Sequence, residues 1–130
     1  MKVKKSSVGN ITKTAIGVLA IAATLWVGKA DAQTYNMNCG DGVQATATLT
    51  DIGFTAAVGV DSFATPLPSD VRTLQNGESL ALQNAVSESG TVATFAATDE
   101  MARQGVFNVT IMDGTRVRFA ATCVAYKVTA

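Results

Sequence analysis

Apolar and polar residues alternate along much of this chain with a period of two, which is typical of a β-strand with one buried and one exposed face. The alternation is clear over residues 43–50 and again over residues 106–112. One face carries Val43, Ala45, Ala47 and Leu49 in the first segment and Phe107, Val109 and Ile111 in the second. A third segment, residues 78–83, places Leu80 and Leu82 on the face opposite to Ala81 and Gln83. These patterns predict half-buried strands.

Turn residues separate the alternating segments about every ten residues. Asn76-Gly77 and Asp113-Gly114 are strong hairpin signals, and Asn76-Gly77 predicts a type I′ turn because both residue types tolerate positive φ. The pattern predicts a first strand that ends at Cys39, and further strands over residues 52–60, 91–97, 115–119 and 121–128. Two further segments lack strand character: Pro66, Pro68, Ser69 and Asp70 predict an irregular loop, and residues 98–105 predict a connection with one helical turn.

Seven or eight short strands separated by turns predict an all-β fold. We expect a small antiparallel β-barrel, with a two-sheet sandwich as the alternative. The strands lie within residues 33–130, which are enough for one small domain, and no linker or repeat in this part of the sequence indicates a second.

The first 32 residues have the composition of an export signal. Lys2, Lys4, Lys5 and Lys13 precede or flank the start of an apolar run over residues 15–27, and Ala30-Asp31-Ala32 follows the run with small residues at alternate positions. This order predicts a secretory signal peptide over residues 1–32, cleaved after Ala32. An uncleaved membrane anchor is the alternative, but the run is shorter than the about 20 apolar residues of a spanning helix. We therefore expect no stable membrane anchor after cleavage.

Removal of residues 1–32 changes the charge of the chain. Five of the ten basic residues and one of the ten acidic residues leave with this segment, so the remainder has five basic and nine acidic residues and a formal charge of −4. An acidic exported domain is a poor candidate for nucleic-acid binding and a plausible partner for a cationic protein, because opposite charges speed encounter. The alternative is that a modest net charge only keeps a small protein soluble.

Two cysteines, Cys39 and Cys123, lie near the two ends of the predicted domain. In an oxidising compartment they predict one disulfide between the first and last strands. A redox-active or metal-binding pair is the alternative, but the chain has no histidine and no Cys-x-x-Cys spacing, so we expect no metal site and no cofactor.

The sequence argues against an enzyme. Without histidine the chain lacks the commonest general base and the usual nucleophile–histidine arrangements. Its aspartates mostly adjoin glycines or strand ends, where Asp usually caps a turn. We therefore assign no catalytic residue.

The Ser87-Glu88-Ser89-Gly90 segment is a polar loop between two predicted strands. Loops on a rigid scaffold often carry binding residues. A solvated turn without a binding role is the alternative, since Ser and Gly are common turn residues.

The order of these features resembles a known family. Five short motifs follow one another along most of residues 33–130: Tyr35-x-x-x-Cys39-x-x-Gly42, Asn76-Gly77-Glu78-x-Leu80-x-Leu82, Ser87-x-Ser89-Gly90, Asp113-Gly114 and the late Cys123. This arrangement is similar to that of the bacterial periplasmic and membrane-bound inhibitors of C-type lysozyme (MliC/PliC-like proteins), which are small antiparallel β-barrels.

The resemblance implies a function and a set of binding residues. In that family a Ser-Gly loop enters the lysozyme cleft and hydrogen-bonds the catalytic carboxylates, assisted by a lysine from a following loop. Carried to this chain, the loop is Ser87, Ser89 and Gly90, and Arg103 stands where the lysine is expected, without the family's Trp-x-Lys-Gly pattern. The expectation is a periplasmic or secreted bacterial inhibitor of C-type lysozyme. The alternative is a non-inhibitory envelope β-domain with a structural or interaction role.

Overall fold

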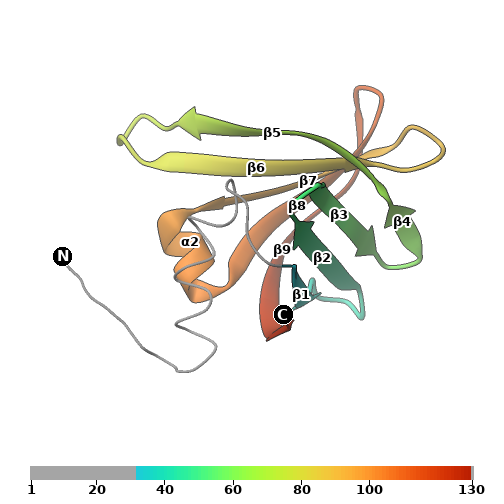
Figure 1. Ribbon diagram of the computed structural model, residues 1–130, viewed down its shortest axis with the longest axis horizontal. Helices are drawn as coiled ribbons and strands as arrows, with labels where there is room; N and C mark the ends of the chain where they lie inside the picture. The colour runs from blue at the N-terminus through green and yellow to red at the C-terminus, as the bar shows by residue number, and fades with distance from the viewer. Residues whose placement is uncertain (1–31, 130) are drawn as a thin grey trace.

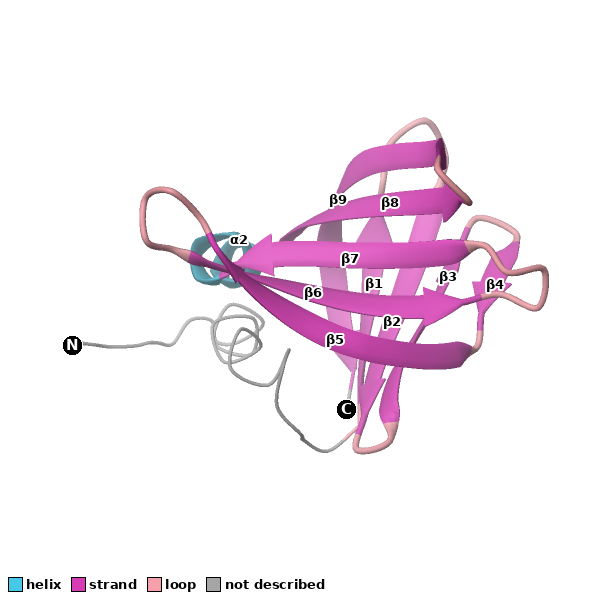
Figure 2. Ribbon diagram, turned by 90° about the horizontal axis from the view of Figure 1, so that it is seen from above, coloured by secondary structure: helices cyan, strands magenta, loops and turns pink. Residues whose placement is uncertain are grey.

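The computed structural model describes residues 32–129, in which nine strands form a single antiparallel sheet that curls into a nearly closed barrel (Figures 1 and 2). The predicted signal peptide lies outside the described residues, except for Ala32. The elements are β1 (Gln33–Asn38), β2 (Gln44–Thr50), β3 (Gly53–Val58), β4 (Asp61–Phe63), β5 (Thr65–Thr73), β6 (Ser79–Val86), β7 (Val92–Thr98), α2 (Asp99–Gln104), β8 (Val106–Asp113) and β9 (Arg116–Thr129).

The sheet consists of two meanders joined through their first and last strands, β1 and β9. The strand order is β4-β3-β2-β1-β9-β8-β7-β6-β5, so every neighbouring pair except β1 and β9 is consecutive in sequence. The first half of β9 pairs with β8, and its second half pairs with β1. On the other side of the barrel β3 contacts β5 and β6 without a ladder, and this contact forms the seam. The fold thus confirms the predicted β-barrel and excludes the sandwich.

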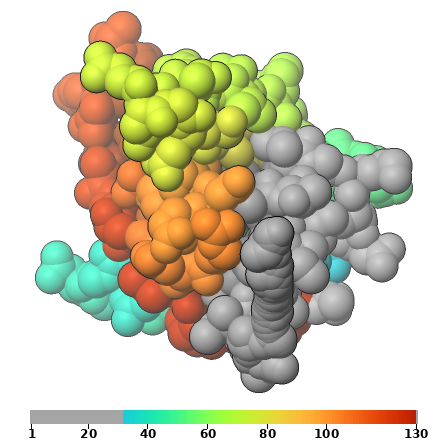
Figure 3. Space-filling view, turned by 90° about the vertical axis from the view of Figure 1, so that its left-hand side faces the viewer, coloured from blue at the N-terminus to red at the C-terminus, as the bar shows by residue number. Residues whose placement is uncertain are grey.

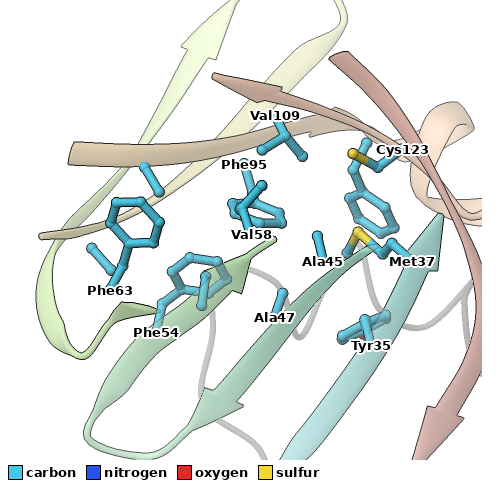
Figure 4. Packing of buried hydrophobic residues seen from close by; sticks show 14 of the residues in the cluster. Tyr35, Met37, Ala45, Ala47, Phe54, Val58, Phe63, Phe95, Val109 and Cys123 are labelled. Atoms are coloured by element: carbon cyan, nitrogen blue, oxygen red, sulfur yellow. The ribbon is translucent and has the colours of Figure 1, made fainter. Parts of the chain in front are cut away.

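Aromatic rings from both meanders fill the barrel (Figure 4). Phe54 of β3 packs edge-on against Phe95 of β7 with ring centroids 5.2 Å apart, and Tyr35 of β1 packs edge-on against Phe107 of β8 at 5.7 Å. Alanines occupy many of the remaining buried positions, beside a few larger aliphatic side chains such as Met37, Leu49 and Ile111, because five aromatic rings already take up much of a small barrel. These buried alanines are Ala45, Ala47, Ala56, Ala85, Ala93, Ala97 and Ala102.

The less hydrophobic face of β6 is the one that is buried. Gln83 and Ala85 are buried in the barrel, whereas Leu80 and Leu82 lie on the outward face and are partly covered. The pairing of Gln83 with Phe95 on β7 places the polar residue next to a large ring. Hydrophobicity alone would select the leucine face, but directly paired residues of antiparallel strands share a face, so the register with the buried Phe95 and Ala93 of β7 directs Gln83 and Ala85 inward.

The prediction of an irregular loop at residues 66–70 is wrong, since these residues belong to β5. β5 is the edge of the sheet, where a proline N–H is not needed for pairing, and Pro66 still aligns with Ala85 of β6. A bulge interrupts the ladder between Leu67 and Asp70, and the Asn84 side-chain amide donates a hydrogen bond of 3.0 Å to the Pro68 carbonyl there. With the short strand β4, the count is nine strands rather than seven or eight.

The connection over residues 98–105 forms the expected single helical turn. Thr98 caps α2 by accepting a hydrogen bond from the Met101 N–H, and Gly105 ends it in the left-handed conformation. The predicted strands at residues 115–119 and 121–128 are instead one continuous strand, β9. Within residues 32–129, no helix has the length and apolar character needed to cross a membrane.

The turn at Asn76-Gly77 differs from the predicted type I′. Gly77 has φ of +89°, but Asn76 is not in the positive-φ region that a type I′ turn requires at both central residues. The chain instead closes with a hydrogen bond of 2.9 Å from the Gly77 N–H to the Leu74 carbonyl, and the Asn76 side chain accepts one from the Glu78 N–H. The asparagine therefore stabilises the loop through its side chain rather than through its backbone conformation.

The disulfide predicted between Cys39 and Cys123 is present and joins the two meanders. Cys39 directly follows β1, Cys123 lies within β9, and the two are 84 residues apart in sequence. Cys123 is fully buried. Such a bond is typical of proteins that fold outside the reducing cytoplasm.

Candidate functional site

The Ser87–Gly90 loop joins β6 to β7 at one end of the barrel (Figures 1 and 2). The Ser87 N–H donates to the Thr91 carbonyl at 2.9 Å, and the Gly90 N–H donates to the Ser87 carbonyl at 3.0 Å. Val86 and Val92 pair directly below it. Gly90 has φ of +89°, a conformation that favours glycine. An added Cβ would meet no atom within 4 Å, so the preference for glycine comes from the backbone conformation and not from crowding. The loop is short, closed and exposed at Glu88, Ser89 and Gly90.

Three hydroxyl groups form a chain along this loop. The Ser87 Oγ lies 2.9 Å from the Ser89 Oγ, which lies 3.2 Å from the Thr91 Oγ1. The Thr91 N–H donates to the Ser87 Oγ at 3.1 Å, and Thr91 itself is buried. Ser89 is the middle member and the most exposed part of the chain. The array therefore holds an exposed hydroxyl in place through its neighbours.

A hollow of about 500 Å³ lies beside the loop, between it and the short strand β4. Ser87, Glu88 and Ser89 line one side, and the β3–β4 turn with Val60 and Asp61 lines another. Arg118 of β9 also reaches this hollow and forms an ion pair of 2.6 Å with the Asp61 Oδ2. The side chains of both partners remain about two-fifths exposed, so the ion pair is open to solvent.

Arg103 lies at the other end of the barrel. It belongs to α2, which follows β7, whereas the serine loop precedes β7; Figures 1 and 2 place the helix and the loop at opposite ends. Figure 3 looks onto the helix end, where α2 (orange) lies between the β5–β6 hairpin (yellow-green) and the last part of β9 (red). The expectation that Ser89 and Arg103 act together at one site therefore does not fit this topology.

Arg103 has a local partner instead. Its guanidinium donates to the Glu100 Oε1 at 2.9 Å, and the Gln104 amide donates to the other carboxylate oxygen at 2.8 Å. The hydrogen bond from Arg103, followed by its charge, lowers the pKa of the Glu100 carboxyl below its usual value. This cluster stabilises the exposed face of a one-turn helix and does not face the serine loop.

The basic residue that lies beside the serine loop is Arg118, which belongs to none of the sequence motifs described above. Its place four residues after Gly114 gives no motif-level signal. The pairing of β8 with β9 brings the Asp113–Arg116 hairpin to the same end of the barrel as the β6–β7 loop, because β7 and β8 are antiparallel neighbours. In the sequence, the only indication that Arg118 lies near the serine loop is that two successive strands separate the loop from the Asp113–Arg116 hairpin.

Within residues 32–129 no group of three or more His, Cys, Asp or Glu side chains is arranged to hold a metal ion. The strongest pKa perturbation of a described group is at Tyr35, where burial raises the pKa of the phenol far above its usual value. That phenol donates a hydrogen bond of 3.2 Å to the Gln33 side chain inside the barrel. It belongs to the core and not to the hollow beside the loop.

Comparison of this chain with protein-family models, with curated proteins and with solved structures found no match. The resemblance to the lysozyme inhibitors therefore stands on the sequence motifs alone.

Proposed function

We propose that this protein is an exported inhibitor of C-type lysozyme, and that it places the Ser87–Gly90 loop in the active-site cleft of the enzyme. The observation that carries the proposal is the exposed Ser89 hydroxyl at the centre of a hydroxyl chain. The N-terminal leader would bring the protein to the periplasm or the exterior, where its target acts.

The hydroxyl chain can prepare Ser89 as a hydrogen-bond donor. A hydroxyl has one proton and accepts two hydrogen bonds. When Ser87 and Thr91 both donate to the Ser89 Oγ, its acceptor sites are filled and its own proton is directed outward. A carboxylate accepts and does not donate, and a hydrogen bond from a hydroxyl to a carboxylate is strengthened by the charge. A catalytic carboxylate is therefore a matching partner for this loop.

The loop would lose little freedom on binding. Its two internal backbone hydrogen bonds and the β6–β7 ladder below it hold one conformation in the free protein. Association is weakened by the ordering of flexible segments, so a loop ordered in advance keeps more of its contact energy.

Charge would speed the encounter. The chain after Ala32 has a formal charge of −4, and Glu88 stands exposed at the tip of the loop. Glu88 would be repelled by catalytic carboxylates alone, so the partner must present basic residues around its cleft. C-type lysozymes, as cationic proteins, satisfy this requirement. Arg118, next to the loop, replaces Arg103 as the basic residue able to approach a carboxylate of the target.

The test is a calorimetric titration of C-type lysozyme with the oxidised protein and its variants. Ser89→Ala removes one charge-assisted hydrogen bond and should weaken binding about tenfold to a hundredfold. Ser89→Trp should abolish binding, because a bulky side chain blocks entry into a narrow cleft. Ser79→Trp, at the exposed start of β6 and the other end of that strand, is the matched control and should bind as the wild type does.

Two further comparisons separate loop insertion from general charge attraction. Raising the salt concentration should lower the association rate of the wild type, because long-range attraction is screened. Arg118→Ala should weaken binding, whereas Arg103→Ala should leave it unchanged. Equal affinity of wild type and Ser89→Trp would exclude the loop as the inhibitory element.

A further inference from the structure

The second half of β5 is an open edge of the sheet. β3 meets the first half, where an added Cβ on Gly53 would lie 2.6 Å from the Pro66 Cβ, but no strand among residues 32–129 forms a ladder with the outer edge of β5. The second half runs with β6 into a hairpin that projects away from β1 to β4 (Figures 1 and 2). Residues 68–73 are all exposed. A free strand edge is a template for pairing with another strand.

The hydrogen bonds at the end of this hairpin show which backbone groups face the open edge. The Leu74 N–H donates to the Glu78 carbonyl at 2.8 Å, so Leu74 faces β6. In an antiparallel pair this orientation alternates from residue to residue, so Val71 and Thr73 direct their N–H and C=O groups to the open edge. In agreement with this, the Val71 N–H donates to the side chain of Asp70, at 2.8 Å from the Oδ1. Val71 and Thr73 are therefore the residues through which a further strand could hydrogen-bond to β5.

The charges on this edge are complementary to themselves. Asp70 and Arg72 flank Val71 on one face of the strand, form an ion pair of 3.4 Å, and have side chains that are more than half exposed. Edge charges of a single sign oppose pairing between identical strands. Two antiparallel copies of β5 centred on Val71 would instead place each Asp70 opposite Arg72 of the other copy, which is a favourable cross-strand pair. These two positions would not be hydrogen-bonded across the new edge, and side chains of such pairs approach most closely.

The rest of this segment is compatible with such a pair of strands. Val71 is 50% exposed, and on the other face of the strand its side chain would meet Val71 of the second copy. The bulge of β5 and its two prolines, which lack the N–H that a ladder requires, come before the regular segment, residues 70–73. The features that usually protect an edge strand are therefore confined to the first half of β5.

We propose that this edge binds a second copy of the protein, with the two β5 strands antiparallel about Val71. The two Val71 residues exchange N–H to C=O hydrogen bonds, and each Asp70 carboxylate leaves its own chain to pair with Arg72 of the second copy. An exposed ion pair within one chain contributes little, so its replacement costs little. The serine loops lie at the other end of each barrel and stay accessible. This dimer does not depend on the lysozyme proposal.

The test is sedimentation equilibrium of the oxidised protein at increasing concentration. Two short strands form a small interface, so we expect a dissociation constant of about 0.1–1 mM for the wild type. Arg72→Asp places acids opposite acids, and Asp70→Arg places bases opposite bases, so each should weaken the dimer at least about tenfold. Arg116→Asp makes the same change of charge as Arg72→Asp at an exposed position of β9; it is the matched control and should dimerise as the wild type does.

Mixing the two charge variants tests the register of the strands. In a pair of one Asp70→Arg chain and one Arg72→Asp chain, each acid again lies opposite a base, so an equimolar mixture should dimerise about as tightly as the wild type. Dimerisation on mixing would also show that both variants are folded. The proposal is overturned if the wild type stays monomeric at about 1 mM, well within reach of a weak interface. It is also overturned if either single variant dimerises as the wild type does, or if the mixture stays monomeric.

Discussion

The Cys39–Cys123 disulfide should account for a large part of the stability of this domain. The bond encloses β2 to β8 and joins β1 to β9, the one neighbouring pair of strands that is not consecutive in sequence. We consider the double variant Cys39→Ala/Cys123→Ala, which removes the bond and leaves no free thiol among residues 32–129.

The magnitude follows from the sequence separation of 84 residues. In the chain-entropy model, closing a loop of this length lowers the free energy of folding by about 4.5 kcal/mol at 25 °C, because it restricts the unfolded chain. Small domains have total stabilities of about 5–15 kcal/mol, so the variant should lose at least about a third of its stability. Residual structure in the unfolded chain reduces this loss of stability but does not remove it.

The assay is urea unfolding followed by far-ultraviolet circular dichroism. With a slope near 1.5 kcal/mol/M, a loss of 4.5 kcal/mol lowers the midpoint by roughly 3 M. Wild-type protein treated with a thiol reductant is the control and should unfold with the same midpoint as the double variant. A loss of stability below about 1 kcal/mol would refute the reasoning, since it would mean that the two strand ends stay together without the bond.

Two other predictions concern the core and the seam. Because burial raises the pKa of Tyr35, the phenol loses its proton at a lower pH in the unfolded chain than in the folded protein. The free energy of unfolding should therefore be unaffected below about pH 10 and should then fall by about 1.4 kcal/mol per pH unit. Tyr35→Phe should remove this slope in unfolding curves measured at alkaline pH. Gly53→Ala should lose about 1–3 kcal/mol more stability than Gly77→Ala in thermal unfolding, because both glycines have positive φ but only an alanine at position 53 would clash with Pro66. Equal losses of stability would show that β3 and β5 are not in contact.

The barrel could be predicted from the sequence because its signals are local. The alternation in residues 43–50 and 106–112 describes strands whose inward faces are apolar, and both faces were assigned as the structure has them. The disulfide followed from two cysteines at the ends of the domain. Each of these features depends on a few neighbouring residues or on simple counting.

The features that were missed depend on position in the sheet. The two prolines of β5 are compatible with a strand only because that strand is an edge, which no local pattern indicates. On β6 the pairing register with β7, in which Gln83 lies opposite the buried Phe95, decides that Gln83 is buried and Leu82 is not. The same holds for the candidate site. The serine loop is a local sequence pattern and can be predicted, but its basic neighbour, Arg118, comes from a strand that is distant in sequence.

Protection of a lysozyme-sensitive cell suspension is the measurement that tests the proposed function most directly. Lysis by C-type lysozyme is followed by turbidity, with increasing amounts of the oxidised protein or of its Ser89→Trp variant. If the serine loop blocks the enzyme, the wild type stops lysis near one molecule per enzyme and the variant does not. Full lysis in the presence of a large excess of wild-type protein would contradict the proposed function, and would favour an envelope β-domain whose loops serve another partner.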